Sequence, residues 1–429
     1  AHMKRLALAL LLLMGVAPSS PARLEKTLAN GVRLVVQQRG TVPWVALTTV
    51  LPGGSHKDPD GRSGLAHLAE HLLFEERNGV PLDSAAEELG MRSNAFTLTD
   101  YTILVEEFSP AVLEAALKIH AARVTPPVFS DTQLQREKRV VADERRFRVD
   151  EPALGRAEEL LFDALWGGHA WGRPVLGWQK DVDAATREDV MRWNQLRVRP
   201  EHAVVVLVGA VDPYRAMRLL EDAMGAWSSP PPVEEPVRPP PAAGTALRVA
   251  RDAPGALDAL LWAVPAAGLG DPNEAADSVL AQILDGDPAR RVKHVPEDWP
   301  PLEFRAEYRP QLHVGEILLT VVPHGMADLA TAQRLAEGYL GLLATEGPDP
   351  AALESVRGRL LADHARMMEL HSALAERLAV DAALLNNPHA HQARQDALRK
   401  VTPDVVKARA KVLLEQPRRA LVRVHAAVP

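Results

Sequence analysis

Two histidines and a glutamate lie at a spacing that suits a metal ion. The stretch SGLAHLAEHLLF contains His67, Glu70 and His71 in the order His-x-x-Glu-His. Apolar residues recur around them at helical spacing, so we expect a helix here. Because a helix advances about 100° per residue, the three side chains fall within an arc of about 100°. Both imidazoles can then bind one ion, with the glutamate on the same face of the helix.

A third protein ligand must come from elsewhere, because hydrolytic zinc sites generally use three protein ligands and keep one position open. The chain has no cysteine, so this ligand must be a carboxylate or a histidine. A helical pattern continues to Pro152 and carries Glu137 and Glu144 on one face, two turns apart. Glu151 is a weaker candidate, because a proline directly after it predicts the end of the helix.

The pattern of helices and strands that must position these residues occurs once in each half of the chain. A proline-rich stretch, 229–244, is predicted to be a linker between an N-terminal zinc-binding domain, 23–228, and a C-terminal domain without a metal site, 245–429. The segments that begin at Ala185 and Val401 both show a threonine cap, an amphipathic helix, a proline-bearing turn and an apolar strand. We therefore expect an α+β fold of two repeated domains, each an antiparallel-rich β-sheet with helices packed on one face.

Composition restricts the partners and the compartment. The net charge is −7 and no basic tract is present, which makes nucleic acid an unsuitable partner. After an apparent cloning remnant, residues 1–22 show a basic start, a short apolar run and a small-residue end, which is typical of a secretory signal peptide. We therefore expect an exported protein, periplasmic or extracellular, with no membrane span in the mature chain.

These motifs together resemble the M16 metallopeptidases, the family of pitrilysin, insulysin and the mitochondrial processing peptidase. The matching stretches are GLAHLAEHLLF, SNAFTLTDYT, EKRVVADERR and HAWGRPVLG. The resemblance implies one Zn²⁺ per chain, with Glu144 as its third ligand beside the two histidines. It also implies that Glu137 supports the site, that Glu70 is the general base, and that Asn94 and Ala95 hold the substrate backbone. The segment SNAFTLTDYTILVEEF has the alternation of a strand.

The second half departs from the family pattern. Active members also use an Arg and a Tyr seven residues apart, but here Pro301 stands seven residues before Tyr308. We therefore expect a zinc endopeptidase subunit whose peptide substrate is enclosed with a partner M16-like subunit that supplies this pair in a heterodimer, or else with a second copy of the chain in a homodimer. If no partner supplies the pair, the second half itself could provide a donor from residues such as Arg305 or Tyr308. The alternative function is a non-catalytic scaffold or peptide-binding subunit.

Overall fold

The computed structural model describes residues 23–40, 42–76, 79–125, 129–229, 231, 247–255, 257–286, 291–292, 294–296, 299, 303–323 and 328–426. The predicted signal peptide and nearly all of the predicted linker lie outside the described residues, so these two predictions and the domain boundaries remain predictions. Within the ranges given above, no helix combines the length and the apolar character needed to cross a membrane.

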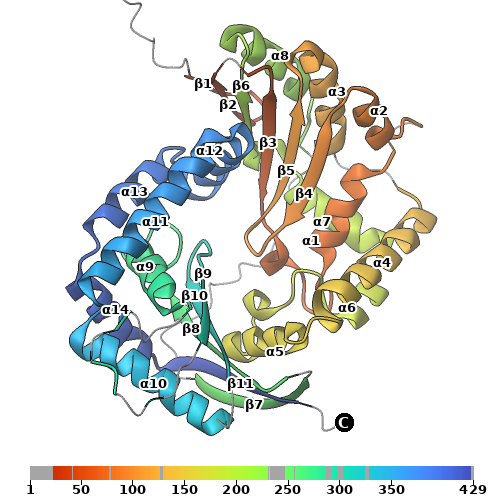
Figure 1. Ribbon diagram of the computed structural model, residues 1–429. Helices are drawn as coiled ribbons and strands as arrows, with labels where there is room; N and C mark the ends of the chain where they lie inside the picture. Colours follow the sequence, from red (N-terminus) through yellow and green to blue (C-terminus); the bar gives the residue numbers. More distant parts are fainter. Residues whose placement is uncertain are drawn as a thin grey trace, which may run out of the picture.

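The first half builds a six-stranded sheet in the order β1-β2-β6-β3-β5-β4 (Figure 1). Its strands are β1 (Arg23–Thr27), β2 (Arg33–Gln38), β3 (Val45–Pro52), β4 (Arg92–Thr97), β5 (Tyr101–Phe108) and β6 (Val204–Gly209). β2 and β6 run parallel, and the other neighbours are antiparallel. Every residue of β6 is buried. Its unbroken apolar run, VVVLVG, suits a strand that is covered on both faces of the sheet.

The second half repeats this arrangement in a five-stranded sheet of order β7-β11-β8-β10-β9. Its strands are β7 (Leu247–Gly255), β8 (Ala259–Ala266), β9 (Glu303–Arg309), β10 (Gly315–Val322) and β11 (Arg418–Ala426). β7 and β11 run parallel and the other pairs antiparallel, as β2 and β6 do in the first sheet. With β1 set aside, the two sheets have the same strand order, which confirms the predicted α+β fold with a repeated domain.

Helices cover the sheets. The first half contains α1 (Leu65–His71), α2 (Leu82–Glu88), α3 (Leu113–Val124), α4 (Asp131–Arg145), α5 (Gly155–Trp166), α6 (Gln179–Ala184), α7 (Arg187–Arg197) and α8 (Pro213–Gly225). The second contains α9 (Glu274–Leu284), α10 (Leu329–Glu346), α11 (Pro350–Glu369), α12 (His371–Leu385), α13 (Ala390–Lys400) and α14 (Pro403–Glu415). α3 and α8 pack on one face of the first sheet, and α9, α10 and α14 on one face of the second. The expected threonine caps begin α7 and α14, at Thr186 and Thr402.

The remaining face of each sheet is covered by a helix from the opposite half. α12 packs on β3 and β6 of the first sheet, where Leu378 is 1% exposed. α5 packs on β8 and β11 of the second sheet, where Leu161 is fully buried. Figure 1 shows both contacts, with blue α12 beside the first sheet and yellow α5 beside the second. The two halves therefore share their hydrophobic cores, an exchange that the repeat pattern did not predict.

The segment SNAFTLTDYTILVEEF differs from the prediction of one strand. It forms two antiparallel strands, β4 and β5, joined by a tight turn in which Leu98 N–H donates to the Tyr101 carbonyl at 2.8 Å. The reason is that the polar Thr99 and Asp100 interrupt the alternation and favour a turn. As a result β4 lies at the edge of the sheet and carries Asn94 and Ala95 beside α1.

Candidate metal centre

The helix that carries both histidines is fixed at its N-terminus by a carboxylate from the segment just before it. Asp58 accepts hydrogen bonds from the backbone N–H groups of Gly64 and Ala66 at 2.7 and 2.9 Å. These are donors that the first turn of a helix leaves without an intrahelical partner. Asp58 is fully buried, and burial raises its pKa to about 7. The carboxylate thus sets where α1 begins and the direction in which its side chains project.

The structure brings His67, His71 and Glu144 together. Glu144 Oε2 lies 3.4 Å from His67 Nε2 and 3.6 Å from His71 Nε2. One ligand atom from each residue lies within 4.8 Å of the others. Within the described residues, this buried Glu144 oxygen has no hydrogen-bond donor. Two imidazole nitrogens and a carboxylate oxygen are a donor set of catalytic zinc sites, so the residues present fit that ion.

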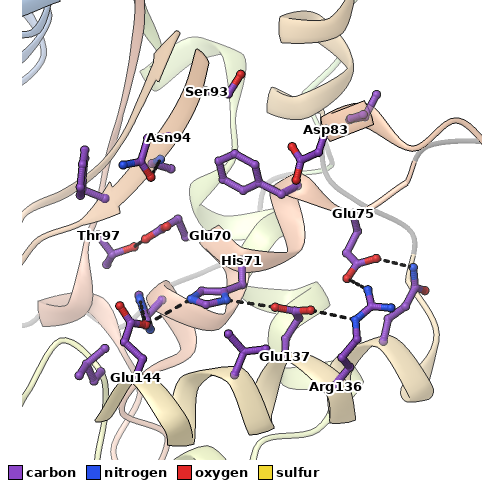
Figure 2. A pocket seen from close by; sticks show the side chains of 18 of the residues that line it. Glu70, His71, Glu75, Asp83, Ser93, Asn94, Thr97, Arg136, Glu137 and Glu144 are labelled. Atoms are coloured by element: carbon purple, nitrogen blue, oxygen red, sulfur yellow. Dashed lines mark hydrogen bonds and ion pairs between the residues drawn. The ribbon is translucent and has the colours of Figure 1, made fainter. Parts of the chain in front are cut away.

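Glu137 lies on the other side of the His71 ring, as Figure 2 shows. Its Oε2 is 3.1 Å from His71 Nδ1, while Arg136 Nε is 3.2 Å from Oε1. Such a carboxylate fixes the orientation of a ligating imidazole and leaves Nε2 for the ion. Burial alone would lower the pKa of His71, but the nearby carboxylates of Glu137 and Glu144 raise it to about 9. Burial lowers the pKa of His67 to about 3.

Glu70 is buried beside the three-donor group and held by the edge strand. Its side chain is 8% exposed, and Thr97 at the end of β4 donates a hydrogen bond from Oγ1 to Glu70 Oε2 at 2.7 Å (Figure 2). Burial raises the pKa of Glu70, and the Thr97 hydrogen bond offsets only part of that rise. A carboxylate with a raised pKa is suited to accept and return a proton near neutral pH.

Sequence reasoning missed Thr97, although the alternation of a strand offered a signal. Residues two apart on a strand share one face, so Ala95 and Thr97 point the same way. Asn94 is exposed, and its Oδ1 accepts the Ala95 N–H at 2.9 Å. All three residues line a cavity of about 940 Å³ that also contains Glu70 and the candidate ligands. The residues predicted to hold a substrate therefore lie next to the residues predicted to bind metal.

The donors considered for the second half do not line this cavity. The Tyr308 hydroxyl donates to the carbonyl of Ala267 at 2.8 Å, and Tyr308 lines a second cavity of about 660 Å³ between the two halves. Arg305 is exposed on β9. Pro301, which interrupts the expected motif, lies outside the described residues.

Comparisons with known proteins identify similar chains. Residues 33–178 match the family model described as insulinase (peptidase family M16), and residues 184–297 match the peptidase M16 inactive domain. The zinc protease PqqE of Helicobacter pylori is 27% identical over 218 residues, 49% of each chain, so the match spans about half the length of this relative.

Two solved structures share the fold. The structure of a protease from Helicobacter pylori superposes with a TM-score of 0.82 at 19% identity, covering 95% of this chain and 100% of that one. The periplasmic protease PqqL from Escherichia coli gives a TM-score of 0.73 at 17% identity, covering 97% of this chain and 50% of that one.

Proposed function

Because the chain belongs to the M16 family of peptidases, we propose that it is a zinc-dependent endopeptidase subunit that hydrolyses peptides or unfolded segments. The observation that carries the proposal is the group of His67, His71 and Glu144, with the buried carboxylate of Glu70 beside it. Zinc held there would polarise a peptide carbonyl and lower the pKa of a bound water toward ~7. Among the described residues one such group is found, in keeping with one ion per chain.

Glu70 is the proposed general base. One of its oxygens accepts the Thr97 hydroxyl, which leaves the other free to take a proton from the attacking water. The same oxygen then returns the proton to the leaving amine. Glu144 is the proposed third ligand, and Glu137 orients His71 through its Nδ1.

The edge strand β4 is the proposed docking strand for the substrate. Its pairing with β5 leaves its other edge without a neighbouring strand in the sheet. A peptide that adds to such an edge is bound through its main chain, so selectivity for its sequence is loose. Asn94 and Ala95 lie on this strand in the metal cavity and are the proposed backbone contacts.

A partner subunit is part of the proposal. Hydrolysis needs donors for the negative charge that develops on the carbonyl oxygen. The Tyr308 hydroxyl is bonded to a main-chain carbonyl, and neither it nor Arg305 lines the metal cavity. We therefore propose that the Arg/Tyr pair comes from a second M16-like chain, in a heterodimer that encloses the peptide. The alternative is a homodimer, in which a second copy of the chain would have to provide a donor such as Arg305 or Tyr308.

The second candidate function is a scaffold or peptide-binding subunit that does not cut its ligand. The buried Glu70 argues against it, because a scaffold has no use for a base beside a metal site. We also propose export to the periplasm or the cell exterior. The N-terminal sequence pattern supports this, as does the likeness to the periplasmic protease PqqL.

Replacement of the base tests the function. Glu70→Gln should lower peptide hydrolysis by about 10²–10⁴-fold while zinc content, measured by atomic emission, stays at the wild-type level. The matched control is Glu76→Gln, the same chemical change on an exposed residue of the same cavity. Loss of zinc from Glu70→Gln would show that Glu70 is a ligand. A wild-type chain that retains zinc but cuts no peptide, alone or with a partner, would favour the scaffold.

A further inference from the structure

Two arginines line the metal cavity within the described residues, and they differ in how many carboxylates they contact. Arg136 forms ion pairs with Glu75 on one side and with Glu137, at 3.2 Å, on the other. Its charge is therefore compensated by two carboxylates. Arg148 contacts one carboxylate, that of Glu144, at 2.8 Å, and its side chain is 64% exposed. Arg148 thus pairs with fewer carboxylates than Arg136 does, and its side chain is more exposed, 64% against 55%.

The position of Arg148 ties it to the candidate metal ligands. Glu144 Oε1 accepts the Arg148 Nη2 donor, while Oε2 of the same carboxylate faces Nε2 of His67 and His71. The guanidinium thus contacts one member of the three-donor group directly, and the Glu144 carboxylate stands between it and the two imidazoles. Arg148 lies in the π-helical segment Arg146–Asp150 that continues α4. Such segments are rare and occur frequently at functional sites.

Arg148 also stands where two cavities meet. The metal cavity of about 940 Å³ and the cavity of about 660 Å³ between the halves share four lining residues, which are Thr97, Arg148, Val175 and Leu176. An extended peptide that passes from one cavity into the other therefore passes the guanidinium. Of these two cavities, Glu70 lines the metal cavity, and Thr97, which hydrogen-bonds to it, lines both.

We propose that Arg148 is a catalytic residue that donates a hydrogen bond to the carbonyl oxygen of the scissile peptide. This inference rests on the proposed function. As water oxygen bonds to the carbonyl carbon, the C=O electron pair moves to oxygen and Glu70 takes the water proton. When the C–N bond breaks, that pair re-forms C=O and Glu70 gives the proton to the amine. Arg148 exchanges no proton, because its guanidinium stays charged throughout.

The test separates stabilisation of the transition state from ligand positioning. In metal-saturated protein, Arg148→Ala should lower kcat by about 10²–10³-fold with little change in KM. Arg148→Lys should recover part of the loss, as should added guanidinium ion. The matched control is Arg146→Ala, which removes an arginine of similar exposure, 56%, that pairs with Asp143 and Glu151 at 3.5 Å. It should have no effect.

A second measurement does not depend on turnover. A phosphinic peptide, whose tetrahedral phosphorus carries a negative oxygen, should bind Arg148→Ala about 10²–10³-fold more weakly than wild type. The parent peptide, measured in the Glu70→Gln background, should bind equally with and without Arg148. Equal phosphinic-peptide affinity in wild type and Arg148→Ala would overturn the inference. So would weakened zinc binding with unchanged kcat at saturating metal, because Arg148 would then only position Glu144. A wild-type chain that cuts nothing defeats the proposed function, while the phosphinic-peptide comparison still decides the role of Arg148.

Discussion

Replacing the two carboxylates that flank His71 should affect zinc binding unequally. Glu144 and Glu137 are seven residues apart on α4, and both carboxylates reach the same imidazole. Glu144 faces the Nε2 atoms of both histidines, whereas Glu137 faces Nδ1 on the far side of the His71 ring. Glu144→Gln therefore removes a ligand, and Glu137→Gln removes the support of a ligand.

The geometry sets the size of each effect. Loss of a carboxylate that orients a metal-bound histidine typically weakens metal binding by about 10–100-fold, or about 1.4–2.7 kcal/mol. We expect this range for Glu137→Gln, because its contact with His71 Nδ1 is 3.1 Å. Glu144→Gln takes away one of three donors and its charge, so we expect zinc affinity to fall by more than about 10³-fold.

Competition with a chromophoric chelator of known zinc affinity measures both losses at one pH. Glu151→Gln is the control, because Glu151 is half exposed and its nearest cation, Arg146, is 3.5 Å away. That variant should bind zinc as the wild type does. A larger loss for Glu137→Gln than for Glu144→Gln would refute the assignment of the third ligand. Equal losses would refute the distinction between ligand and support.

Three further predictions concern the base, the helix cap and the partner. Thr97→Val should lower kcat by about tenfold with KM and zinc content unchanged, and Thr97→Ser should restore it, because the hydroxyl orients Glu70. Burial raises the pKa of Asp58 from 3.8 to about 7, so the folded state holds this proton more tightly than the unfolded state. The contribution of Asp58 to the free energy of unfolding should therefore fall, by up to about 4 kcal/mol, as pH rises from 4 to 7. In urea titrations the difference in stability between wild type and Asp58→Asn should shift by that amount over this range. Finally, the isolated chain should cut peptides slowly, and a partner that supplies Arg and Tyr should raise the rate without changing zinc content. A full rate without any partner would refute the heterodimer proposal.

The sequence predicts what depends on local spacing. His67, Glu70 and His71 share one helix face because four or fewer residues separate them, and the structure has them so. The repeat of a capped helix before an apolar strand likewise follows from local signals at Thr186 and Thr402.

The remaining features depend on contacts that join one element to residues outside it. Asp58 caps α1 from outside the helix, and Thr97 reaches Glu70 from a strand. Arg148 lies where two cavities meet, and the second of these cavities is lined by residues from both halves, so its position cannot be predicted from either half alone. The spacing of Glu144 after the metal helix indicates a ligand only through the family resemblance, because the 72 residues between His71 and Glu144 leave its position in space undetermined.

Because α5 covers the second sheet and α12 covers the first, each half of the chain depends on the other for part of its hydrophobic core. If residues 23–228 were produced alone, the face of the first sheet that α12 covers would meet water, with its row of valines uncovered. Residues 245–429 alone would lose α5 and uncover the matching face of the second sheet. Neither fragment is then a self-sufficient folding unit, since exposed apolar sheet faces drive aggregation. Produced together, the fragments should recombine as a split protein does, each supplying the cover that the other lacks.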